Sequence, residues 1–191
     1  MGVGRVKMLC GIDEAGRGCI AGPLVVAGVV LKNSIKGLAD SKILSEKKRD
    51  KLFTLIKESA DYKIVFCDNE MIDTKGLSYS LGYAIKEIKE YFKECKILMD
   101  GNSSFGVEGV ETMIKADAKI AEVSAASILA KVSRDSYMYD ICDKFPNYSF
   151  AKHKGYGTPL HVEEIKEHGY SSIHRKSFKI KALREPSLFT N

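Results

Sequence analysis

Residues 9–31, LCGIDEAGRGCIAGPLVVAGVVL, contain two short apolar runs separated by a glycine-rich turn. The runs, Leu9–Ile12 and Leu24–Leu31, have the length and the β-branched composition of buried strands. The turn is unusual because it begins with the acidic pair Asp13 and Glu14 and also contains an arginine. Neighbouring carboxylates repel each other, and a turn needs glycine but no acid. The stretch therefore predicts two strands of a sheet, joined at a site that uses charges of both signs and bare backbone.

The rest of the chain alternates between helix and strand patterns. Apolar residues at helical spacing predict helices at residues 45–60, 77–92, 124–143 and 161–168. Short apolar runs predict further strands at residues 62–67, 96–99 and 112–115. Because strands come first and then alternate with helices, we expect an α/β fold in which helices flank a mixed sheet. There is no internal repeat and no clear linker, which favours one domain.

The composition is that of a globular protein. The chain has 191 residues, of which 45% are hydrophobic, enough for one packed core. No run is long and apolar enough to span a membrane, and the first motif follows too soon for a secretory signal. The cysteines are odd in number, widely spaced and without a CxxC pair, which is typical of reduced thiols in the cytoplasm. The net charge of +5 is compatible with a polyanionic partner but does not by itself indicate one.

Four carboxylates are placed near the ends of predicted strands. Asp13 and Glu14 follow the first strand, Asp100 ends another, and Asp117 follows a third. Ligand sites gather at strand ends, so adjacent strands would bring these acids together. Oxygen ligands without cysteine or histidine favour Mg²⁺ or Mn²⁺, and two such ions can activate water at a phosphodiester. Each acid also has a simpler interpretation, since Asp100-Gly101 is typical of a turn and Asp117 of a helix entry or a surface acid.

The Gly16-Arg17-Gly18 turn offers backbone N–H groups and one guanidinium to a ligand. Its glycines look like a loose dinucleotide-binding GxGxxG, but that motif opens a helix, and here Pro23 and a strand follow. The spacing to Gly22 is also one residue too long, and the Gly-Lys-Ser/Thr of a phosphate-binding loop is absent there. The turn therefore predicts a backbone cradle for a sugar or phosphate group beside the metal site.

Six blocks of the sequence, in order from about residue 9 to 178, resemble the motifs of ribonuclease HII. The blocks are GIDEAGRG (11–18), ADSKILSEKKR (39–49), ILMDGN (97–102), KADAKIAEVSAASILAKVSRD (115–135), FAKHKGYGTPLH (150–161) and HRKSF (174–178). The resemblance implies a ribonuclease H-like fold, with a five-stranded mixed sheet flanked by helices. It also implies one catalytic domain over residues 1–191, in which about 145–191 form a small helical, substrate-contacting C-terminal part.

The same resemblance implies an enzyme that hydrolyses phosphodiesters with two divalent ions, Mg²⁺ or Mn²⁺. It would cut the RNA strand of RNA–DNA hybrids, and it would cut 5′ of a single ribonucleotide embedded in duplex DNA. The products would carry 5′-phosphate and 3′-hydroxyl ends, as RNA primer removal and ribonucleotide removal from DNA require. We expect a cytoplasmic enzyme that acts as a monomer.

Carried onto this sequence, the resemblance assigns the catalytic and metal-binding roles to Asp13, Glu14, Asp100 and Asp117. Asp135, in an Arg-Asp pair, competes for the fourth position, but the family pattern favours Asp117. The histidines have no metal-like spacing, and His153 is interpreted as structural or phosphate-facing and not as a general base.

Substrate-binding roles fall by the same resemblance on Gly16, Arg17, Gly18, Lys42, Tyr156, Arg175 and Lys176. The Gly-Arg-Gly turn would grip the ribose 2′-OH and the adjacent phosphate, because the 2′-OH distinguishes RNA from DNA at one nucleotide. Tyr156 would stack on the next sugar and sense the same hydroxyl, and Lys42 would hold a phosphate near the cut. The two C-terminal basic residues are expected to touch the duplex backbone. Without the resemblance, Tyr156 would be interpreted as a half-buried tyrosine and Lys42 as a solvated loop lysine.

The chain departs from the family pattern at two places. Ile43 stands where a second lysine is usual, so one basic contact near the substrate is either missing or not important for the family's activity. Ala116 replaces a glycine but leaves Asp117 in register. Because the first motif begins near residue 11, we expect no counterpart of the extra N-terminal domain of ribonuclease HIII. A Leu-Phe pair in the tail resembles part of a sliding-clamp peptide, but the glutamine and second aromatic residue of such peptides are missing.

Three other functions remain open from the sequence. A non-catalytic hybrid-binding module would keep the basic residues but would not need four carboxylates. A metabolic protein that binds nucleotides or sugar phosphates would use the glycine turn, although the strand after that turn disfavours it. A nuclease of the same broad fold that acts on DNA junctions would share the acids but not the Gly-Arg-Gly turn or Tyr156.

Overall fold

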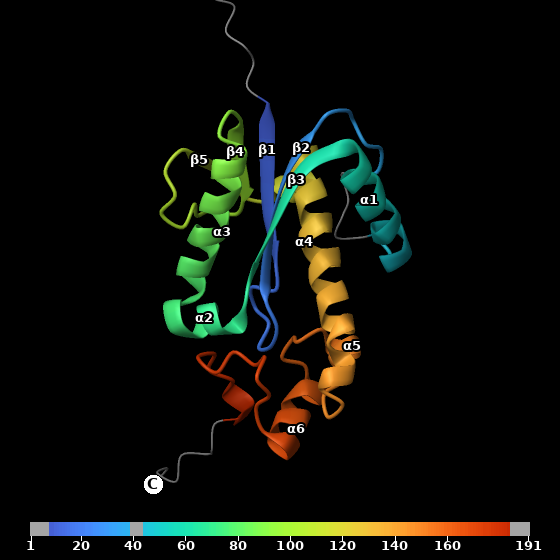
Figure 1. Ribbon diagram of the computed structural model, residues 1–191, viewed down its shortest axis with the longest axis vertical. Helices are drawn as coiled ribbons and strands as arrows, with labels where there is room; N and C mark the ends of the chain where they lie inside the picture. The colour runs from blue at the N-terminus through green and yellow to red at the C-terminus, as the bar shows by residue number, and fades with distance from the viewer. Residues whose placement is uncertain (1–7, 39–43, 184–191) are drawn as a thin grey trace, which may run out of the picture.

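A computed structural model describes residues 8–38 and 44–183 of the chain. In this part of the chain five strands form one mixed sheet in the order β3-β2-β1-β4-β5 (Figure 1). The strands are β1 (Leu9–Ala15), β2 (Leu24–Leu31), β3 (Ala60–Cys67), β4 (Lys96–Asp100) and β5 (Val110–Met113). The β1–β2 and β2–β3 pairs are antiparallel, whereas β1–β4 and β4–β5 are parallel. The expected five-stranded mixed sheet is confirmed.

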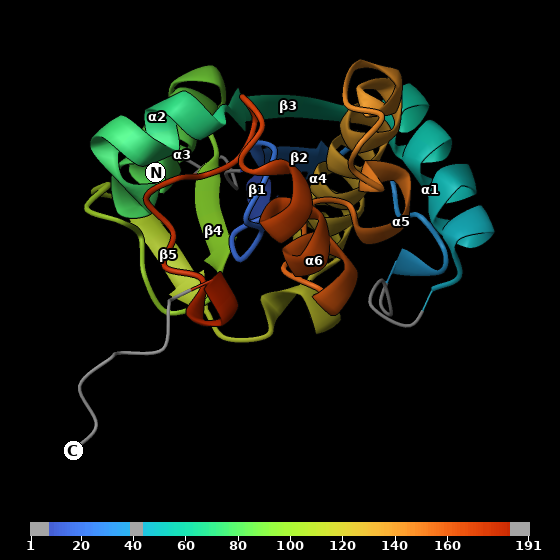
Figure 2. The same cartoon turned by 90° about the horizontal axis from the view of Figure 1, so that it is seen from below.

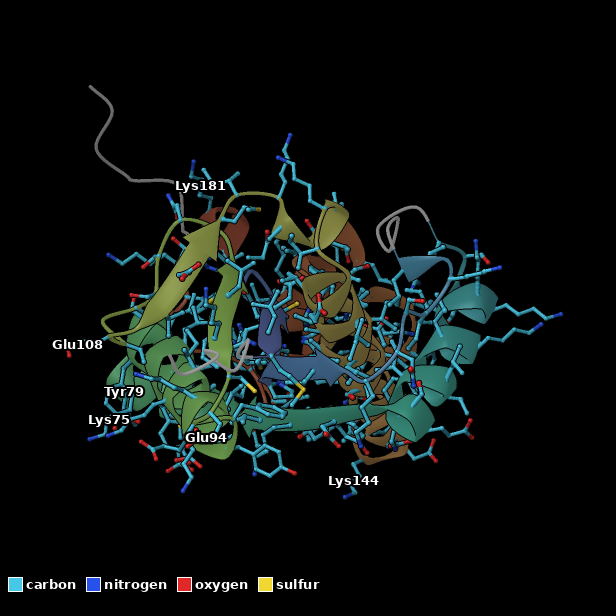
Figure 3. All side chains as sticks on the ribbon, turned by 90° about the horizontal axis from the view of Figure 1, so that it is seen from above. Lys75, Tyr79, Glu94, Glu108, Lys144 and Lys181 are labelled. Atoms are coloured by element: carbon cyan, nitrogen blue, oxygen red, sulfur yellow. The ribbon has the colours of Figure 1, made fainter. Side chains whose placement is uncertain are left out.

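Helices cover both faces of this sheet (Figure 2). They are α1 (Glu46–Ser59), α2 (Asn69–Lys75), α3 (Leu77–Tyr91), α4 (Ala121–Asp140), α5 (Phe150–His153) and α6 (Pro159–His168), with the short 3-10 helices η2 (Ala116–Ala118), η3 (Cys142–Lys144) and η4 (Lys181–Leu183). Helices α1 and α4 pack on one face, and α2 and α3 pack on the other. Charged side chains such as Lys75, Glu94 and Lys144 project outward from these layers (Figure 3).

Strand β2 shows why the sequence contains an uninterrupted apolar run. Val26 and Val30 pack toward α3, whereas Val25 and Val29 pack toward α1 and α4. A strand covered on both faces has no solvent side, so polar residues do not alternate along it. The same alternation runs along β1, where Ile12 faces α3 and Ala15 faces α4.

The C-terminal part packs against the end of the sheet where β1 turns into β2 (Figure 1). Its apolar cluster joins Ile20 and Ala21 of that turn to Met138 of α4, Phe150 of α5 and Ile165 of α6. The backbone of the turn also pairs with this part, since Gly155 O accepts from the N–H groups of Ile20 and Ala21. The C-terminal part is therefore placed to shape the Gly-Arg-Gly turn.

Among the element boundaries that differ from the sequence prediction, three lie near the carboxylates or at the start of α4. Strand β1 extends through Ala15, because its pairing with β2 continues to Ala15↔Val25, so Asp13 and Glu14 lie inside the strand and not after it. Strand β5 begins at Val110 and ends at Met113, before the left-handed residue Lys115 (φ 59°). Helix α4 begins before Ser124, whose hydroxyl donates to Leu38 O across the core and does not cap the helix.

Helix α2 was missed by the sequence prediction because only seven residues form it, too few for a clear apolar stripe. The Asp68 side chain caps it by accepting from Met71 N at 2.7 Å. In the part of the chain that the structure describes, no helix has the length and apolar character needed to cross a membrane.

Candidate active site

Three carboxylates converge at the end of β1 and β4. Asp13, Asp100 and Asp117 each offer an oxygen, and these oxygens lie within 4.8 Å of one another. Asp13 and Asp100 come directly after the paired residues Ile12↔Met99 of two parallel strands, so their side chains reach the same edge and the same face. Together these residues, here called the acid trio, form the cluster that the strand ends predicted.

Asp117 joins the acid trio through a sharp turn after β5. Lys115 adopts the left-handed conformation, and the next amide, Ala116 N, donates to Asp100 Oδ1 at 2.7 Å. This bond fixes the start of η2, which carries Asp117 inward to 2% exposure. Asp135 lies elsewhere, in α4, where it pairs with Lys131 at 2.9 Å, and it is not among the acids of the trio.

Burial and like charge act together on Asp13. Its side chain is only 6% exposed, and burial, reinforced by the nearby Glu14 carboxylate, raises the pKa of Asp13 from 3.8 to about 7. The Ser127 hydroxyl of α4 lowers this pKa by a smaller amount. A divalent cation would remove the repulsion, and a set made of carboxylate oxygens alone fits Mg²⁺ or Mn²⁺. The acid trio is therefore suited to hold such an ion.

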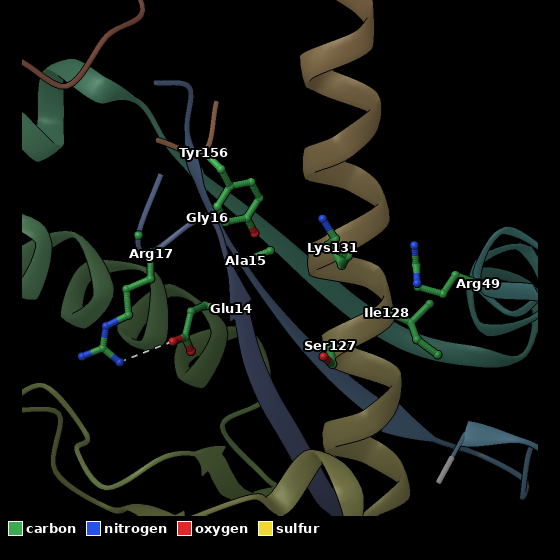
Figure 4. A pocket seen from close by; sticks show the side chains of 10 residues that line it. Glu14, Ala15, Gly16, Arg17, Arg49, Ser127, Ile128, Lys131 and Tyr156 are labelled. Atoms are coloured by element: carbon green, nitrogen blue, oxygen red, sulfur yellow. Dashed lines mark hydrogen bonds and ion pairs between the residues drawn. The ribbon is translucent and has the colours of Figure 1, made fainter. Parts of the chain in front are cut away.

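Glu14 lies beside the acid trio and not within it. Successive side chains of a strand point to opposite faces, so Glu14 lies on the α3 side of the sheet. There its Oε1 lies 3.5 Å from Arg17 Nη1 (Figure 4). Burial raises the pKa of Glu14, Arg17 opposes that shift, and the charge of Asp100 adds to it. Glu14 is thus close enough to Asp100 to feel its charge, although its closest ionic partner is Arg17.

Glycine is favoured at the two ends of the Gly-Arg-Gly turn for different structural reasons. Gly16 has φ +89°, and a Cβ there would lie 2.1 Å from Nε of the buried Arg134. At Gly18 a Cβ would meet nothing within 4 Å, so this backbone is open to an approaching ligand. Arg17 projects between them and is 53% exposed, with its guanidinium 5.2 Å from the centre of the Phe105 ring. The turn therefore has a packed side and an accessible side.

A cavity of about 420 Å³ lies between this turn and helix α4 (Figure 4). It is lined by Glu14, Ala15, Gly16, Arg17, Gly18, Arg49, Ser127, Ile128, Lys131 and Tyr156. Tyr156 is 39% exposed, and its ring lies 5.5 Å from Lys131 Nζ. Burial raises the pKa of Tyr156, which keeps its hydroxyl protonated at neutral pH. One cavity thus brings together an acid, the open turn, an aromatic ring and three cationic side chains, those of Arg17, Arg49 and Lys131.

The remaining predicted residues have separate positions. Lys42 and its neighbour Ile43 lie outside the described residues. Lys176 is exposed, and its backbone N–H donates to Asp73. His153 is buried and bonds Glu164 at 2.9 Å, away from the cavity, as its structural interpretation requires.

Arg175 is a correction to the sequence prediction. It was expected to touch the duplex, but it is fully buried, and its guanidinium donates to Gly22 O at 3.0 Å and to Gly16 O at 2.7 Å. A guanidinium with its N–H groups directed at interior carbonyls cannot reach a duplex. Arg134, Lys131 and Arg49 were missed, because basic residues within helices are usually solvated and carry no motif signal of their own.

Comparison with known proteins agrees with this geometry. The family model described as ribonuclease HII matches residues 10–181. The chain belongs to the ribonuclease HII family. Ribonuclease HII of Aliarcobacter butzleri (strain RM4018) is 61% identical over 182 residues, which are 94% of this chain and 95% of that protein. Ribonuclease HII of Sulfurovum sp. (strain NBC37-1) is 53% identical over 185 residues, or 97% and 98% of the two chains.

Solved structures show the same relationship. The ribonuclease HII of Archaeoglobus fulgidus, solved in complex with PCNA, superposes with a TM-score of 0.78 at 30% identity. The match covers 95% of this chain and 98% of that one. As a member of this family, the protein is a hydrolase, an endoribonuclease that degrades the RNA of RNA–DNA hybrids. The ribonuclease H-like fold and the enzyme class expected from the six sequence blocks are confirmed.

Proposed function

We propose that this member of the ribonuclease HII family cuts 5′ of a single ribonucleotide embedded in duplex DNA as well as within the RNA strand of hybrids. The products carry 5′-phosphate and 3′-hydroxyl ends, and the reaction depends on Mg²⁺ or Mn²⁺. The observation that carries the proposal is the cavity on the open side of the Gly-Arg-Gly turn, which lies next to the acid trio. Its wall includes Glu14, the chain neighbour of Asp13, and Ser127, whose hydroxyl bonds the Asp13 carboxylate. A phosphodiester that enters it would meet the Glu14 carboxylate on one side and the hydrogen-bond donors of the turn on the other.

The acid trio would hold the divalent ions, with Glu14 completing the ligand set from the other face of β1. When bound, two such ions supply an activated water and stabilise the leaving 3′-oxygen. Burial raises the pKa of Asp13 to about 7, so at neutral pH part of the protein carries a proton on this carboxyl, and ion binding would displace it. Ala116 N, bonded to Asp100, orients that carboxylate toward the shared position.

Recognition of the ribonucleotide falls to the other side of the cavity. Gly18 lets the substrate backbone approach closely, and Arg17 supplies a guanidinium for the adjacent phosphate. Tyr156 offers a ring for stacking on a sugar and a protonated hydroxyl near the 2′-OH. Lys42 and Lys176 are proposed to contact phosphates further along the duplex. Affinity would then rest on phosphate contacts and fall with salt, whereas the choice of cut would rest on the 2′-OH.

We propose further that residues 1–191 act as one catalytic domain and as a monomer in the cytoplasm. The apolar cluster shared by α4, the turn and the C-terminal part supports one domain, because these segments lack separate cores. Free cysteines in the described residues support a reducing compartment. The Leu-Phe pair in the tail lies outside the described residues, and a sliding clamp is not part of this proposal.

The test uses a labelled DNA duplex with one embedded ribonucleotide, incubated with Mg²⁺ or Mn²⁺. Wild type should cut once, 5′ of the ribonucleotide, and should leave an all-DNA duplex intact. Asp13→Asn should lose cutting, whereas Asp143→Asn, which removes an exposed acid far from the trio, should keep it. Cutting of the all-DNA duplex, or unchanged cutting by Asp13→Asn, would contradict the proposal.

A further inference from the structure

Two arginines lie beneath the turn that joins β1 to β2. Arg134 of α4 is 1% exposed, and Arg175 of the C-terminal part is 0% exposed. Arg134 donates to Pro23 O at 2.9 Å and to Ala21 O at 3.0 Å. Arg175 donates to Gly22 O and Gly16 O. The backbone of residues 16–23, here called the β1–β2 turn, therefore rests on two guanidinium groups from distant parts of the chain.

Neither guanidinium is neutralised by an acid. Among the residues that the structure describes, no carboxylate forms an ion pair with Arg134 or Arg175. Asp73 acts on Arg175 only through space, because its oxygens accept from Lys176 and Ser177. Burial lowers the pKa of Arg175 to about 10, so it keeps its charge at neutral pH. Carbonyl oxygens satisfy most of the N–H groups, but the two positive charges remain.

Buried charges without a counter-ion are unfavourable, and a nearby anion would relieve that cost. The opposite side of the β1–β2 turn is suited to receive one. The N–H groups of Arg17 and Gly18 donate to no acceptor in the described part of the chain. Gly18 has open space where a side chain would be. Free donors above and fixed positive charges below are the features of an anion-binding concavity in a turn.

Arg134 also fixes the segment that carries Tyr156. Its third donor, Nη1, bonds Lys154 O at 2.8 Å, and its Cζ lies 5.6 Å from the centre of the Tyr156 ring. At Gly155 a Cβ would lie 2.3 Å from Ala21 O, so the two segments touch through bare backbone. One guanidinium thus sets the distance between the β1–β2 turn and the tyrosine across the cavity.

We propose that Arg134 and Arg175 are positioning residues that hold the β1–β2 turn ready to bind, and that their unneutralised charges favour one backbone phosphate of the nucleic acid at Arg17 and Gly18. The inference rests on the proposed function, since it names what holds and charges the turn that recognises the ribonucleotide. Neither arginine touches the substrate. They act through the turn's backbone and through their electric field, and they explain why Gly16 and Gly155 leave room for a guanidinium.

The test measures binding without divalent ions, in EDTA, so that the acid trio's chemistry does not contribute. The probes are labelled DNA duplexes with one ribonucleotide, each with a single neutral methylphosphonate at a linkage that follows a deoxynucleotide. The variants are Arg175→Met, which removes the charge at similar length, and Arg175→Lys, which keeps the charge but loses the fork. The control is Ile165→Ala, which removes apolar packing from the cluster that also contains Ile20 and Ala21 of the turn, but leaves both guanidinium groups and their hydrogen bonds to the turn in place. Thermal unfolding of each variant establishes that it is folded at the assay temperature.

In wild type, one methylphosphonate position should lower affinity about tenfold, the effect of losing one charge-assisted contact. Arg175→Met should bind the unmodified duplex about tenfold more weakly than wild type does. Introducing the methylphosphonate at that same position should lower the affinity of this variant less than about threefold. Ile165→Ala should keep the full wild-type response. If Arg175→Met responds as wild type does at every position, or if Ile165→Ala matches Arg175→Met, the inference is wrong.

Arg175→Lys covers the case in which Arg175→Met does not fold. A single ammonium cannot bond both Gly16 O and Gly22 O, so this variant should bind the unmodified duplex at least about threefold more weakly than wild type does. Because the positive charge is retained, the methylphosphonate should lower its affinity as much as it does in wild type. Wild-type affinity in Arg175→Lys would overturn the positioning role. The proposed function has its own contrary result. Wild type would bind duplexes with and without the ribonucleotide equally and would cut neither. The effect of the methylphosphonate on binding could still be measured in that case.

Discussion

The acid trio and the β1–β2 turn both gather like charges at one end of the sheet, but they are built differently. The carboxylates come from β1, β4 and the turn after β5, and their backbone support includes the bond from Ala116 N to Asp100. The guanidinium groups of Arg134 and Arg175 instead donate to carbonyls of the same turn from two distant segments. The carboxylates face one another directly, so their mutual repulsion favours a bound cation. The arginines lie behind the backbone of the turn, and their positive charges favour an anion on its other side.

This difference suggests a division of roles. A cluster of like-charged acids costs stability in the protein alone, and this cost is offset when divalent ions bind. A turn held by two buried guanidinium groups is rigid before any ligand binds, and such preorganisation lowers the entropy lost on binding. The carboxylates would therefore govern chemistry, and the turn would govern binding. Changes on the two sides should separate these properties.

The largest expected effect on stability distinguishes the two sides of the turn itself. Gly16→Ala places a methyl group against Arg134 at a positive φ, and should destabilise the fold by roughly 3 kcal/mol. Gly18→Ala meets open space and should change stability by less than about 0.5 kcal/mol, yet weaken duplex binding about tenfold by blocking close approach. Urea unfolding and fluorescence anisotropy measure the two quantities. Equal destabilisation by both changes would contradict the packed and open sides described here.

The next effect concerns the cost of the acid trio. Between about pH 4 and 7 the native Asp13 carboxyl holds a proton that the unfolded chain releases, so metal-free stability should fall as pH rises through this window. Asp13→Asn removes the titrating group and with it this loss of stability at higher pH. It should therefore match wild type near pH 3.5 and exceed it by roughly 2 kcal/mol, and at most about 4, near pH 8. Urea unfolding in EDTA across pH measures this, with Asp143→Asn as the control, and a constant difference between Asp13→Asn and wild type would argue against it.

The smallest effect concerns Tyr156. If the ring stacks on a sugar, Tyr156→Leu should weaken binding of the ribonucleotide duplex about tenfold, whereas Tyr156→Phe should change it less than about threefold. The Tyr156 hydroxyl should instead help the enzyme to distinguish ribose from deoxyribose. Tyr156→Phe should therefore reduce the ratio between the cleavage rates of duplexes with and without the ribonucleotide. Competition between duplexes with and without the ribonucleotide measures this. Identical behaviour of the two variants would show that the ring makes no contact of its own.

The sheet and the acid trio were largely predictable from the sequence. Apolar runs located the strands, and carboxylates near strand ends predicted convergence, which the oxygens of Asp13, Asp100 and Asp117 show. Glu14 was not separable from Asp13 by sequence, because the prediction ended β1 too early and missed the alternation that sends them to opposite faces. A strand's end depends on its partner's register, which a single sequence does not contain.

The support of the turn was not predictable in the same way. Arg175 stands in the basic block HRKSF and was expected at the surface, but the turn's carbonyls need donors that only a folded C-terminal part can bring. Arg134 did leave a signal, since it lies four residues after Ala130 and four before Met138 on the buried stripe of α4. A charged residue inside an apolar stripe marks a buried, hydrogen-bonded group, and that mark was available in the sequence.

The most direct test of the division between chemistry and binding is to measure both for Asp100→Asn on one labelled duplex with a single ribonucleotide. In EDTA the variant should bind at least as tightly as wild type, because a negative charge near the phosphates has been removed. With Mg²⁺ its single-turnover cleavage should fall by about a thousandfold or more. Cleavage within tenfold of wild type, or binding that weakens as much as cleavage does, would contradict the account.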